Sequence, residues 1–292
     1  MRRVKVVKFL GGLGNQMFQF AFYAALSEKF GERVKADISG FKNYGLHNGY
    51  ELQRIFPVNL KYSSGWENFV LGGGSDIVSL KLRLRLGITV SSYYEQKGAS
   101  YYDAAIFEDY SSTYYWGFWQ NEKYFSEISD KIKASFSFES VLKERNAEME
   151  QMIKGSNAIS IHVRRGDYVN HSLHGGVCDL DYYRKAIMHI ETICKDPTYF
   201  VFSDDIDWCR ENLQIKRDCY FIDWNKGTES YIDMQLMSLC KHNIIANSSF
   251  SWWGAWLNSN RGNVVVAPGK WFAEQEVDRH ASDLIPARWT RV

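Results

Sequence analysis

Apolar residues in the second half of the chain recur in short runs, separated by longer stretches in which apolar and polar residues mix with helical spacing. The short runs predict buried strands, and the stretches between them are long enough for helices. Strands that alternate with helices predict a parallel sheet with right-handed crossovers, as in Rossmann-like domains. The expected strands cover residues 158–163, 198–202, 219–222, 243–246 and 264–267, and the expected helices 181–194, 206–213, 229–240 and 252–259.

The first half of the chain opens with a related pattern. Residues 4–9 alternate as a strand, a glycine-rich loop follows over 11–16, and residues 17–30 are typical of an aromatic-rich helix that Gly31 ends. A second strand is expected over 34–38, whereas the turn-rich stretch 40–74 predicts no regular element. Leucines alternate with basic residues over 71–87, which favours a half-buried strand over a stripe that binds nucleic acid.

The next segments indicate where the chain divides. Residues 121–134 and 139–154 are typical of helices rich in Glu and Lys, and residues 155–157 stop the second helix directly before the next strand. We therefore expect an N-terminal domain over 1–154 and a C-terminal domain over 155–292.

Two features of the first half have more than one interpretation. Gly11, Gly12 and Gly14 do not complete a dinucleotide-binding fingerprint, because Met17 stands where the third glycine belongs. The loop still predicts backbone amides at a helix N-terminus, which suit a phosphate or a sugar hydroxyl. The aromatic run 114–120 is either core packing or the lining of an acceptor-sugar cleft.

Composition narrows the class of protein. A net charge of +1 predicts no general attraction to nucleic acid or to an anionic membrane, so an anion must be bound by locally placed charge. Five cysteines without a C-x-x-C pair favour reduced thiols in a cytoplasmic protein. No apolar run has the length expected of a signal sequence or a membrane span.

Charged side chains gather where the strand 158–163 should end. His162 lies in this strand, and Arg164, Arg165 and Asp167 follow it. Ligands of open α/β sheets bind at the carboxyl ends of the strands. Two neighbouring guanidiniums there favour an anion, because each can meet two phosphate oxygens at once. The other interpretation is that these arginines only pair with acidic residues elsewhere in the chain.

A second cluster follows the strand 198–202. Ser203, Asp204 and Asp205 would lie at the same edge of the sheet, where a carboxylate could accept hydrogen bonds from guanine N–H groups or from ribose hydroxyls. Alternatively, Asp204 is only the N-cap of the next helix.

The third cluster lies where the strand 243–246 gives way to a helix. Asn247, Ser248, Ser249 and Ser251 place an amide and three hydroxyls there, and the free N–H groups of a helix start favour an anion. Ser249 and Ser251 could be caps alone, but together with two arginines on a neighbouring strand they describe a diphosphate site.

A metal is not expected at this site. Asp205 and Asp207 match the D-x-D pattern of metal-dependent glycosyltransferases, but they would start a helix and diverge, and two arginines already neutralise a diphosphate. The chain lacks the H-E-x-x-H, G-x-S-x-G and G-x-x-x-x-G-K-[ST] motifs, which argues against a zinc hydrolase, a serine hydrolase and a P-loop kinase.

Three motifs occur in order along the chain: GGLGNQMFQ over 11–19, HVRRGD over 162–167 and SSFSWWGA over 248–255. Together they resemble the motif set of the bacterial α-1,2-fucosyltransferases of glycosyltransferase family 11, and the resemblance spans residues 8–268. It implies a metal-independent enzyme without a cofactor, with GDP-fucose as its donor. It also implies two Rossmann-like domains facing a cleft, the GT-B type, with the acceptor on the side of the N-terminal domain and the GDP-sugar in the C-terminal domain.

The position of single residues at the strand ends, together with the resemblance, suggests their roles. Arg164 would neutralise the β-phosphate, and Asp167 and His162 are further catalytic candidates. Asp167 is the first candidate for the base, ahead of His162, His171, His174 and Asp179. Alternatively, Asp167 only fixes Arg165 or the turn at Gly166, and Arg165 only holds the loop through a carboxylate. The residues expected to bind the donor are Asn15, His162, Arg164, Arg165, Asp204, Ser248, Ser249 and Phe250.

The expected reaction is inverting transfer of L-fucose to a galactose-containing oligosaccharide, at the 2-OH of a terminal galactose. Another GDP-sugar-dependent glycosyltransferase of the same architecture is an alternative, and so is a GDP-sugar- or glycan-binding protein without turnover. The paired arginines favour catalysis, because a lectin needs no diphosphate clamp. Animal members carry a membrane anchor that this chain lacks, which suits a cytoplasmic bacterial enzyme. The sequence leaves the acceptor glycan and the oligomeric state open.

Overall fold

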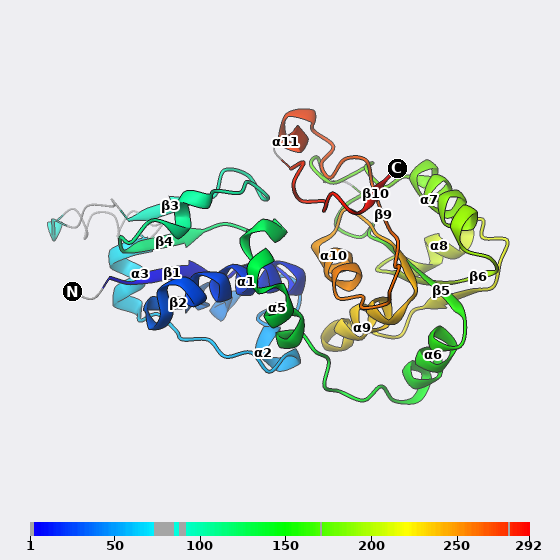
Figure 1. Ribbon diagram of the computed structural model, residues 1–292, viewed down its shortest axis with the longest axis horizontal. Helices are drawn as coiled ribbons and strands as arrows, with labels where there is room; N and C mark the ends of the chain where they lie inside the picture. Colours follow the sequence, from blue (N-terminus) through cyan, green and yellow to red (C-terminus); the bar gives the residue numbers. More distant parts are fainter. Residues whose placement is uncertain (1–2, 73–84, 88–91, 170, 280) are drawn as a thin grey trace. The chain divides into compact units, whose positions relative to one another are not determined.

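The computed structural model describes residues 3–72, 85–87, 92–169, 171–279 and 281–292, and the chain divides into two compact units, Met1–Ser137 and Phe138–Val292. Each unit has its own parallel sheet and is described by itself (Figure 1). The division falls before the expected boundary at 154, because helix α6 (Glu144–Lys154) packs against elements of the second unit.

The sheet of the first unit has four described strands in the order β2-β1-β4-β3, all parallel. They are β1 (Lys5–Lys8), β2 (Val34–Asp37), β3 (Tyr93–Glu95) and β4 (Thr113–Trp116). The strands expected over 4–9 and 34–38 are thus confirmed. The helical segments of this unit are α1 (Leu13–Phe30), η1 (Gly31–Arg33), η2 (Ser39–Asn43), α2 (Leu52–Ile55), α3 (Gly65–Gly72), η3 (Ala104–Phe107), η4 (Glu122–Tyr124), η5 (Ser126–Ile128) and α5 (Ser129–Ser135).

The core of the first unit is built on α1 and the aromatic run of β4. Phe22 of α1 stacks on Trp119 with ring centroids 3.9 Å apart, and Tyr115 meets Phe22 edge-on. Trp119 and Phe22 are fully buried, and a buried aromatic side chain stabilises a fold by about 2–3 kcal/mol. Core packing therefore explains Tyr114, Tyr115 and Trp119, whereas Trp116 and Phe118 are only partly buried.

Three expected elements of the first half need comment. The helix expected over 121–134 is instead two short 3₁₀ turns and α5, because the Asn121 side chain caps η4 and Phe125 is drawn into the core. The helix expected over 139–154 begins only at Glu144. The strand expected over 71–87 overlaps α3 at its first two residues, and most of the rest of it lies outside the described residues.

The sheet of the second unit has six described strands in the order β10-β9-β8-β5-β6-β7, again all parallel. They are β5 (Asn157–Val163), β6 (Pro197–Ser203), β7 (Cys219–Ile222), β8 (His242–Ile244), β9 (Val265–Ala267) and β10 (Thr290–Arg291). The described helical segments besides α6 are α7 (Leu180–Ile193), α8 (Ile206–Asn212), η6 (Gly227–Glu229), α9 (Tyr231–Leu239), α10 (Ser249–Trp256) and α11 (Gln275–Arg279).

The strand–helix alternation predicted for the second half is confirmed. Strand β5 is central and almost wholly buried, as expected of a strand covered on both faces. Its register pairs Val163 with Ser203 of β6 and Ile161 with Ile244 of β8. The carboxyl ends of β5, β6 and β8 therefore lie side by side, as the three strand-end clusters require.

None of the described helices is long and apolar enough to cross a membrane. The five cysteines are all free thiols.

Candidate functional site

The loop after β5 holds its two arginines with different carboxylates. Arg164 bridges two of them: its Nη1 lies 2.9 Å from Asp204 Oδ2, and its Nη2 lies 2.7 Å from Asp167 Oδ1. Arg165 donates from Nε to Asp205 Oδ2 at 3.1 Å, and its guanidinium lies over the Trp208 ring at 3.8 Å. Asp167 thus fixes Arg164 rather than Arg165, and a carboxylate holds Arg165 in place.

Asp204 orders the backbone of this loop. Its Oδ1 accepts from the Arg165 amide at 2.9 Å, and its Oδ2 accepts from the Gly166 amide at 3.1 Å in addition to Arg164. A Cβ at Gly166 would come within 2.7 Å of Asp204 Oδ2, so only glycine permits this approach. One carboxylate at the end of β6 therefore fixes the backbone of the loop after β5.

The interpretation of Asp204 as a helix cap is wrong. The N-cap of α8 is Asp205, whose side chain accepts from the Trp208 amide at 3.3 Å. Asp207, the second member of the D-x-D pattern, pairs with Arg210 at 3.0 Å. Within the described parts of the chain, no group of three or more His, Cys, Asp or Glu side chains could hold a metal ion.

His162 is the buried member of the cluster. Burial lowers its pKa to about 4, against the raising effect of Asp204, so the imidazole is neutral at neutral pH. Its ring lies 5.8 Å from that of Phe250, and its Nδ1 is buried without a hydrogen-bond partner among the described residues. The imidazole nitrogen Nδ1 is thus a buried polar atom that the described residues around it leave unpaired.

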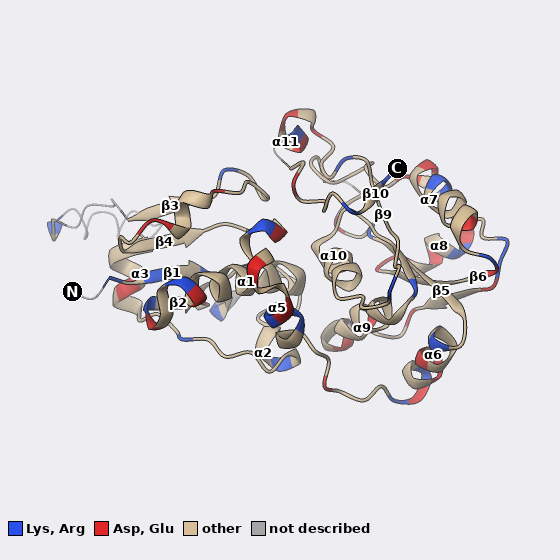
Figure 2. Ribbon diagram, in the orientation of Figure 1, with Lys and Arg blue, Asp and Glu red and all other residues tan. Residues whose placement is uncertain are grey.

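Helix α10 begins at the carboxyl end of β8 with the third cluster. Ser248 is its N-cap and accepts from the Phe250 amide at 3.3 Å, while the Ser251 hydroxyl donates to backbone carbonyls. The cap is therefore Ser248, not Ser249 or Ser251. No charged side chain lies on α10 (Figure 2), so nothing on the helix opposes the positive end of its dipole.

Asn247 is a structural amide. Its Nδ2 donates to the carbonyls of His174 at 3.2 Å and Trp271 at 3.0 Å, and it is 2% exposed. It thereby joins the loop after β5 to the segment after β9. The loop, Asn247 and Trp208 line a cavity of about 410 Å³, together with Arg164, Arg165, Tyr168, Val169, His174, Gly175, Gly176, Cys178, Asp179, Leu180 and Asp181.

The weaker base candidates have structural contacts. Asp179 is the N-cap of α7 and accepts from the Tyr182 amide at 2.8 Å. His174 stacks on Tyr168 with ring centroids 4.6 Å apart, lies 4.8 Å from the His171 ring, and burial lowers its pKa to about 4. The structure brings Asp167 and His162 to the cluster of Arg164, and places the others farther along the loop.

In the first unit, Asn15 lies at the start of α1, beside the carboxyl end of β1. Its Oδ1 accepts from Gln120 Nε2 at 2.7 Å. Gln16 of the same motif spans two loops, because it donates to the Gly11 and Gly49 carbonyls and accepts from the Glu51 amide at 2.9 Å. Side-chain amides of the glycine-rich motif thus order the loops at this edge of the first sheet.

One carboxylate of the second unit was missed in the sequence. Asp233 lies in the first turn of α9, where burial raises its pKa to about 8, and it accepts from Asn225 Nδ2 at 2.8 Å. Asn225 is bonded in turn to Asn146 of α6, which also accepts from Trp224 Nε1 at 2.8 Å. Helix α9 packs against α10, while the hydrogen-bonded partners of Asp233 lie in the loop before α9 and in α6. A carboxylate with a strongly raised pKa is a signal for a functional group, but it appears only once the fold is known.

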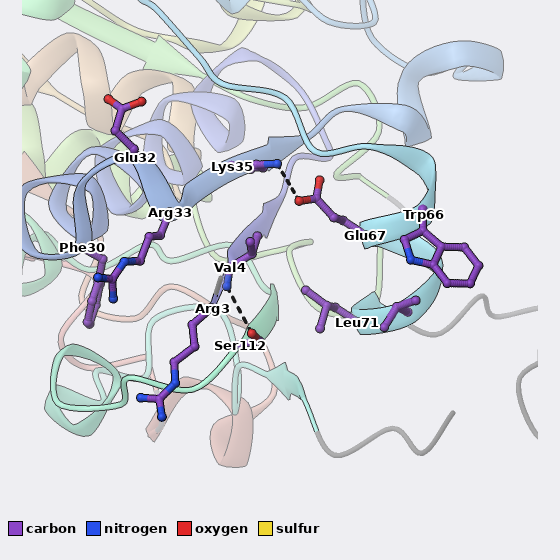
Figure 3. Close-up of a pocket in the computed structure, with 11 residues that line it drawn as sticks. Arg3, Val4, Phe30, Glu32, Arg33, Lys35, Trp66, Glu67, Leu71 and Ser112 are labelled. Atoms are coloured by element: carbon purple, nitrogen blue, oxygen red, sulfur yellow. Dashed lines mark hydrogen bonds and ion pairs between the residues drawn. The ribbon is translucent and has the colours of Figure 1, made fainter. Parts of the chain in front are cut away.

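The first unit also has a cavity of about 950 Å³ at the opposite edge of its sheet (Figure 3). Val4, Arg33 and Ser112, which directly precede β1, β2 and β4, line it, and Lys35 pairs across it with Glu67 at 2.6 Å. Because ligands of parallel sheets bind at the carboxyl ends of the strands, we place the candidate site elsewhere.

Comparisons with known proteins identify the family of this chain. The chain is 34% identical to an alpha-1,2-colitosyltransferase of Escherichia coli over 302 residues, which cover 99% of both chains. It is 31% identical to the O-antigen biosynthesis glycosyltransferase WbnK of Escherichia coli, over 90% of this chain and 93% of that protein.

Among solved structures, a crystal structure of NodZ alpha-1,6-fucosyltransferase soaked with GDP-fucose matches 87% of this chain and 92% of its own, with a TM-score of 0.51 and 14% identity. That likeness concerns the fold, which is the GT-B type with two Rossmann-like domains. Residues 85–291 match the model of the family described as glycosyl transferase family 11. The chain belongs to glycosyl transferase family 11.

Proposed function

We propose that this family 11 glycosyltransferase moves L-fucose from GDP-fucose to the 2-OH of a terminal galactose in a glycan, with inversion at the anomeric carbon. The observation that carries the proposal is the bridged Arg164 at the carboxyl end of β5, next to the start of α10. A guanidinium has five N–H donors, and the two carboxylates leave several of them for phosphate oxygens.

The proposed chemistry is a displacement. The acceptor hydroxyl attacks the anomeric carbon from the face opposite to GDP, and the bond from that carbon to the β-phosphate oxygen breaks. Negative charge then builds on the departing diphosphate. Arg164 and the backbone amide of Ser249 at the start of α10 neutralise that charge, so their effect is larger in the transition state than in the ground state. This arrangement supplies the charge for which other glycosyltransferases use a cation, and we propose that no metal is needed.

The other donor contacts follow from the same geometry. His162 precedes Arg164 by two residues and its ring lies 5.8 Å from that of Phe250, while Arg165 holds the loop through Asp205. Asp167 orients Arg164, and we propose that it takes the acceptor proton only if the pair with Arg164 opens. Asn15 meets the donor from the first unit.

The nucleoside was expected to be read by Asp204, but both oxygens of Asp204 already accept bonds from the loop. Asp233 accepts from Asn225, and burial raises its pKa to about 8. Hydrogen bonds from guanine N1–H and the 2-amino group would favour the ionised carboxylate and so lower that pKa when the nucleotide binds. We therefore propose Asp233 for the nucleoside and Asp204 for the order of the loop. Calorimetry with GDP compares the two. Asp233→Asn should weaken binding about tenfold or more, whereas equal affinity in that variant would return the role to Asp204.

A second donor is favoured by one comparison, because a relative at 34% identity is named as a colitosyltransferase. The deciding experiment offers the protein GDP-fucose, GDP-colitose and UDP-sugars with galactosides, and reads product mass and linkage. Transfer of fucose in an α-1,2 linkage supports the proposal, and transfer of colitose alone supports the second donor. GDP binding without any turnover would leave a binding protein. Turnover that EDTA abolishes and magnesium or manganese restores would refute metal independence.

A further inference from the structure

One wall of the cavity at the amino-terminal edge of the first sheet is helix α3 (Figure 3). This helix has four large apolar side chains within eight residues, yet none of its residues is buried. The four are Trp66, Phe69, Val70 and Leu71, and all but Phe69 line the cavity. The side chain of Trp66 is 57% exposed. A helix of this composition normally turns its apolar side chains into a core, so α3 leaves apolar surface available at the cavity.

Contacts at both ends fix α3 in this position. At its start, the Glu67 amide donates to Ser64 Oγ at 3.2 Å and the Ser64 amide donates to Glu67 Oε2 at 2.8 Å, a reciprocal capping box. Lys35 of β2 pairs with the other oxygen of Glu67 at 2.6 Å. At the end of the helix, a Cβ at Gly72 would fall 2.7 Å from the Tyr114 ring, so glycine lets α3 lie against β4. The exposed indole is therefore carried by a fixed element.

Two arginines line another side of the same cavity. Arg3 and Arg33 come shortly before β1 and β2, which are neighbouring parallel strands about 5 Å apart. Among the described residues, the Arg33 guanidinium has no ion pair, and the Arg3 guanidinium donates only to the Tyr110 carbonyl, at 3.4 Å. Two guanidiniums that start from adjacent strands can converge on one anion.

The acidic side chains that line the cavity are engaged elsewhere. Glu67 pairs with Lys35, and Glu32 pairs with Lys61. The arginines therefore add positive charge that the described acidic residues do not balance. A guanidinium fork matches the two oxygens of a carboxylate, which makes a carboxylate a suitable ligand group here.

We infer that this cavity binds an acidic oligosaccharide, with the carboxylate of one sugar on Arg3 and Arg33 and the apolar face of a nearby sugar on Trp66. An exposed indole offers a large, flat apolar surface, and a cavity of about 950 Å³ has room for a few sugar units. Figure 3 shows the two arginines on the side of Phe30 and Trp66 on the other side, so the charged and the flat contacts fall to different sugars. Because these residues line a hollow, they suit a ligand that enters it better than the flat surface of a bilayer. The site lies outside the transfer reaction and does not rest on the proposed function.

Calorimetric titration of the full chain tests the inference without any turnover. The probes are tetrasaccharides that contain glucuronic, galacturonic or sialic acid, each compared with its carboxyl-reduced counterpart. At least one acidic tetrasaccharide should bind about tenfold or more tightly than its reduced form, because the reduced form lacks the charge-assisted hydrogen bonds. Arg33→Gln should weaken binding of the acidic compound about tenfold. Arg261→Gln removes another exposed arginine, in the second unit, and is the matched control that should be silent.

Two changes at Trp66 test the flat contact. Trp66→Ala should weaken binding of the acidic tetrasaccharide about tenfold, whereas Trp66→Phe keeps a flat ring and should change it less than about threefold. The Tm of the Trp66 and Arg33 variants should stay within about 2 °C of wild type, because both side chains are exposed. Loss of binding together with such a Tm locates the effect at the cavity and not in the fold.

Several results would overturn the inference. One is that no acidic tetrasaccharide binds at concentrations up to about 10 mM. Another is that the reduced compounds bind equally well, or that neither Arg33→Gln nor Trp66→Ala weakens binding. Inorganic phosphate that displaces the tetrasaccharide, combined with a silent Trp66→Ala, would mean a simple anion site. Binding to phosphatidylglycerol vesicles that Trp66→Ala abolishes, without binding of any tetrasaccharide, would mean a membrane contact instead.

Discussion

The carboxyl end of β5 and the carboxyl end of β1 order their loops by different means. At β5, two guanidiniums and three carboxylates form an ion-paired cluster around Arg164. At β1, the side-chain amides of Asn15, Gln16 and Gln120 do the same work without a formal charge. Ion pairs can respond to charge that appears on a leaving group, whereas amides fix direction. The difference predicts that the β5 edge governs turnover and the β1 edge governs how the donor is oriented.

The largest effect is expected when the ion-paired cluster at the carboxyl end of β5 is disrupted. Arg164→Lys keeps the charge but loses the planar fork that bridges two carboxylates, and should lower kcat about 100-fold or more. Initial rates at saturating donor and acceptor measure it. Arg210→Lys is the matched control, because Arg210 also bridges two carboxylates, Asp207 and Asp223, but is not part of the cluster. Near-normal turnover of the Arg164 variant would show that the β5 edge does not govern turnover.

The next change tests whether Asp167 orients or takes a proton. Asp167→Asn keeps an oxygen that can accept from Arg164, so kcat should fall about tenfold with its pH profile preserved. A general base contributes more, typically about 100-fold to 10,000-fold, and its loss removes the acidic limb of the profile. A pH–rate series on both proteins at saturating donor decides, and loss of that limb would make Asp167 the base.

The salt dependence of GDP binding tests the same difference between the β5 and β1 edges, with a smaller expected effect. Raising NaCl from about 0.05 M to about 0.5 M should weaken GDP binding several-fold, because screening acts on the partly exposed arginines. The penalty of Asn15→Ala on the donor KM should stay constant over the same range. A penalty that shrinks with salt would mean that the β1 edge is electrostatic as well.

Asp233 differs from the other carboxylates discussed for the second unit, because its partner is the neutral amide of Asn225. Replacing Asp233 should have the smallest of the expected effects. Burial raises its pKa to about 8, so the folded protein keeps it protonated at a pH where the unfolded chain is ionised. Its contribution to stability is thus fully present below about pH 4 and is lost as the pH rises through about 8. Asp233→Asn has no such slope. Its Tm relative to wild type should rise by a few degrees between pH 5 and about pH 8.5 in calorimetric melting, and a constant difference would contradict the raised pKa.

The strands and the three strand-end clusters could be predicted from the sequence because they depend on local patterns. β-Branched residues at 159, 161 and 163 identify β5, and the arginines follow it directly. Partners could not be predicted. Asp204 and Asp205 are adjacent and chemically alike, and only the packed loop decides that Asp205 caps α8 while Asp204 binds the amides of Arg165 and Gly166.

The missed residues depend on contacts between distant segments. Gln120 stands at the end of an aromatic run that indicates core, and its partner Asn15 lies 105 residues earlier. Asp233 occupies an ordinary polar position of a helix pattern, and its environment comes from Asn225 and Asn146, which belong to other elements. Sequence patterns report on residues that are close in the chain, whereas these two sites are formed by residues that are distant in the chain and close in space.

The central place of β5 has a consequence for how the protein is made. Its two neighbours in the sheet, β6 and β8, are separated in the chain by β7 and two helices, so one side of β5 stays unpaired until residues 242–244 have left the ribosome. Parallel pairing over such a distance is slow, and an open strand edge invites association with other chains. During synthesis, β5 with its arginine loop therefore passes through an interval in which its edge can pair with another chain.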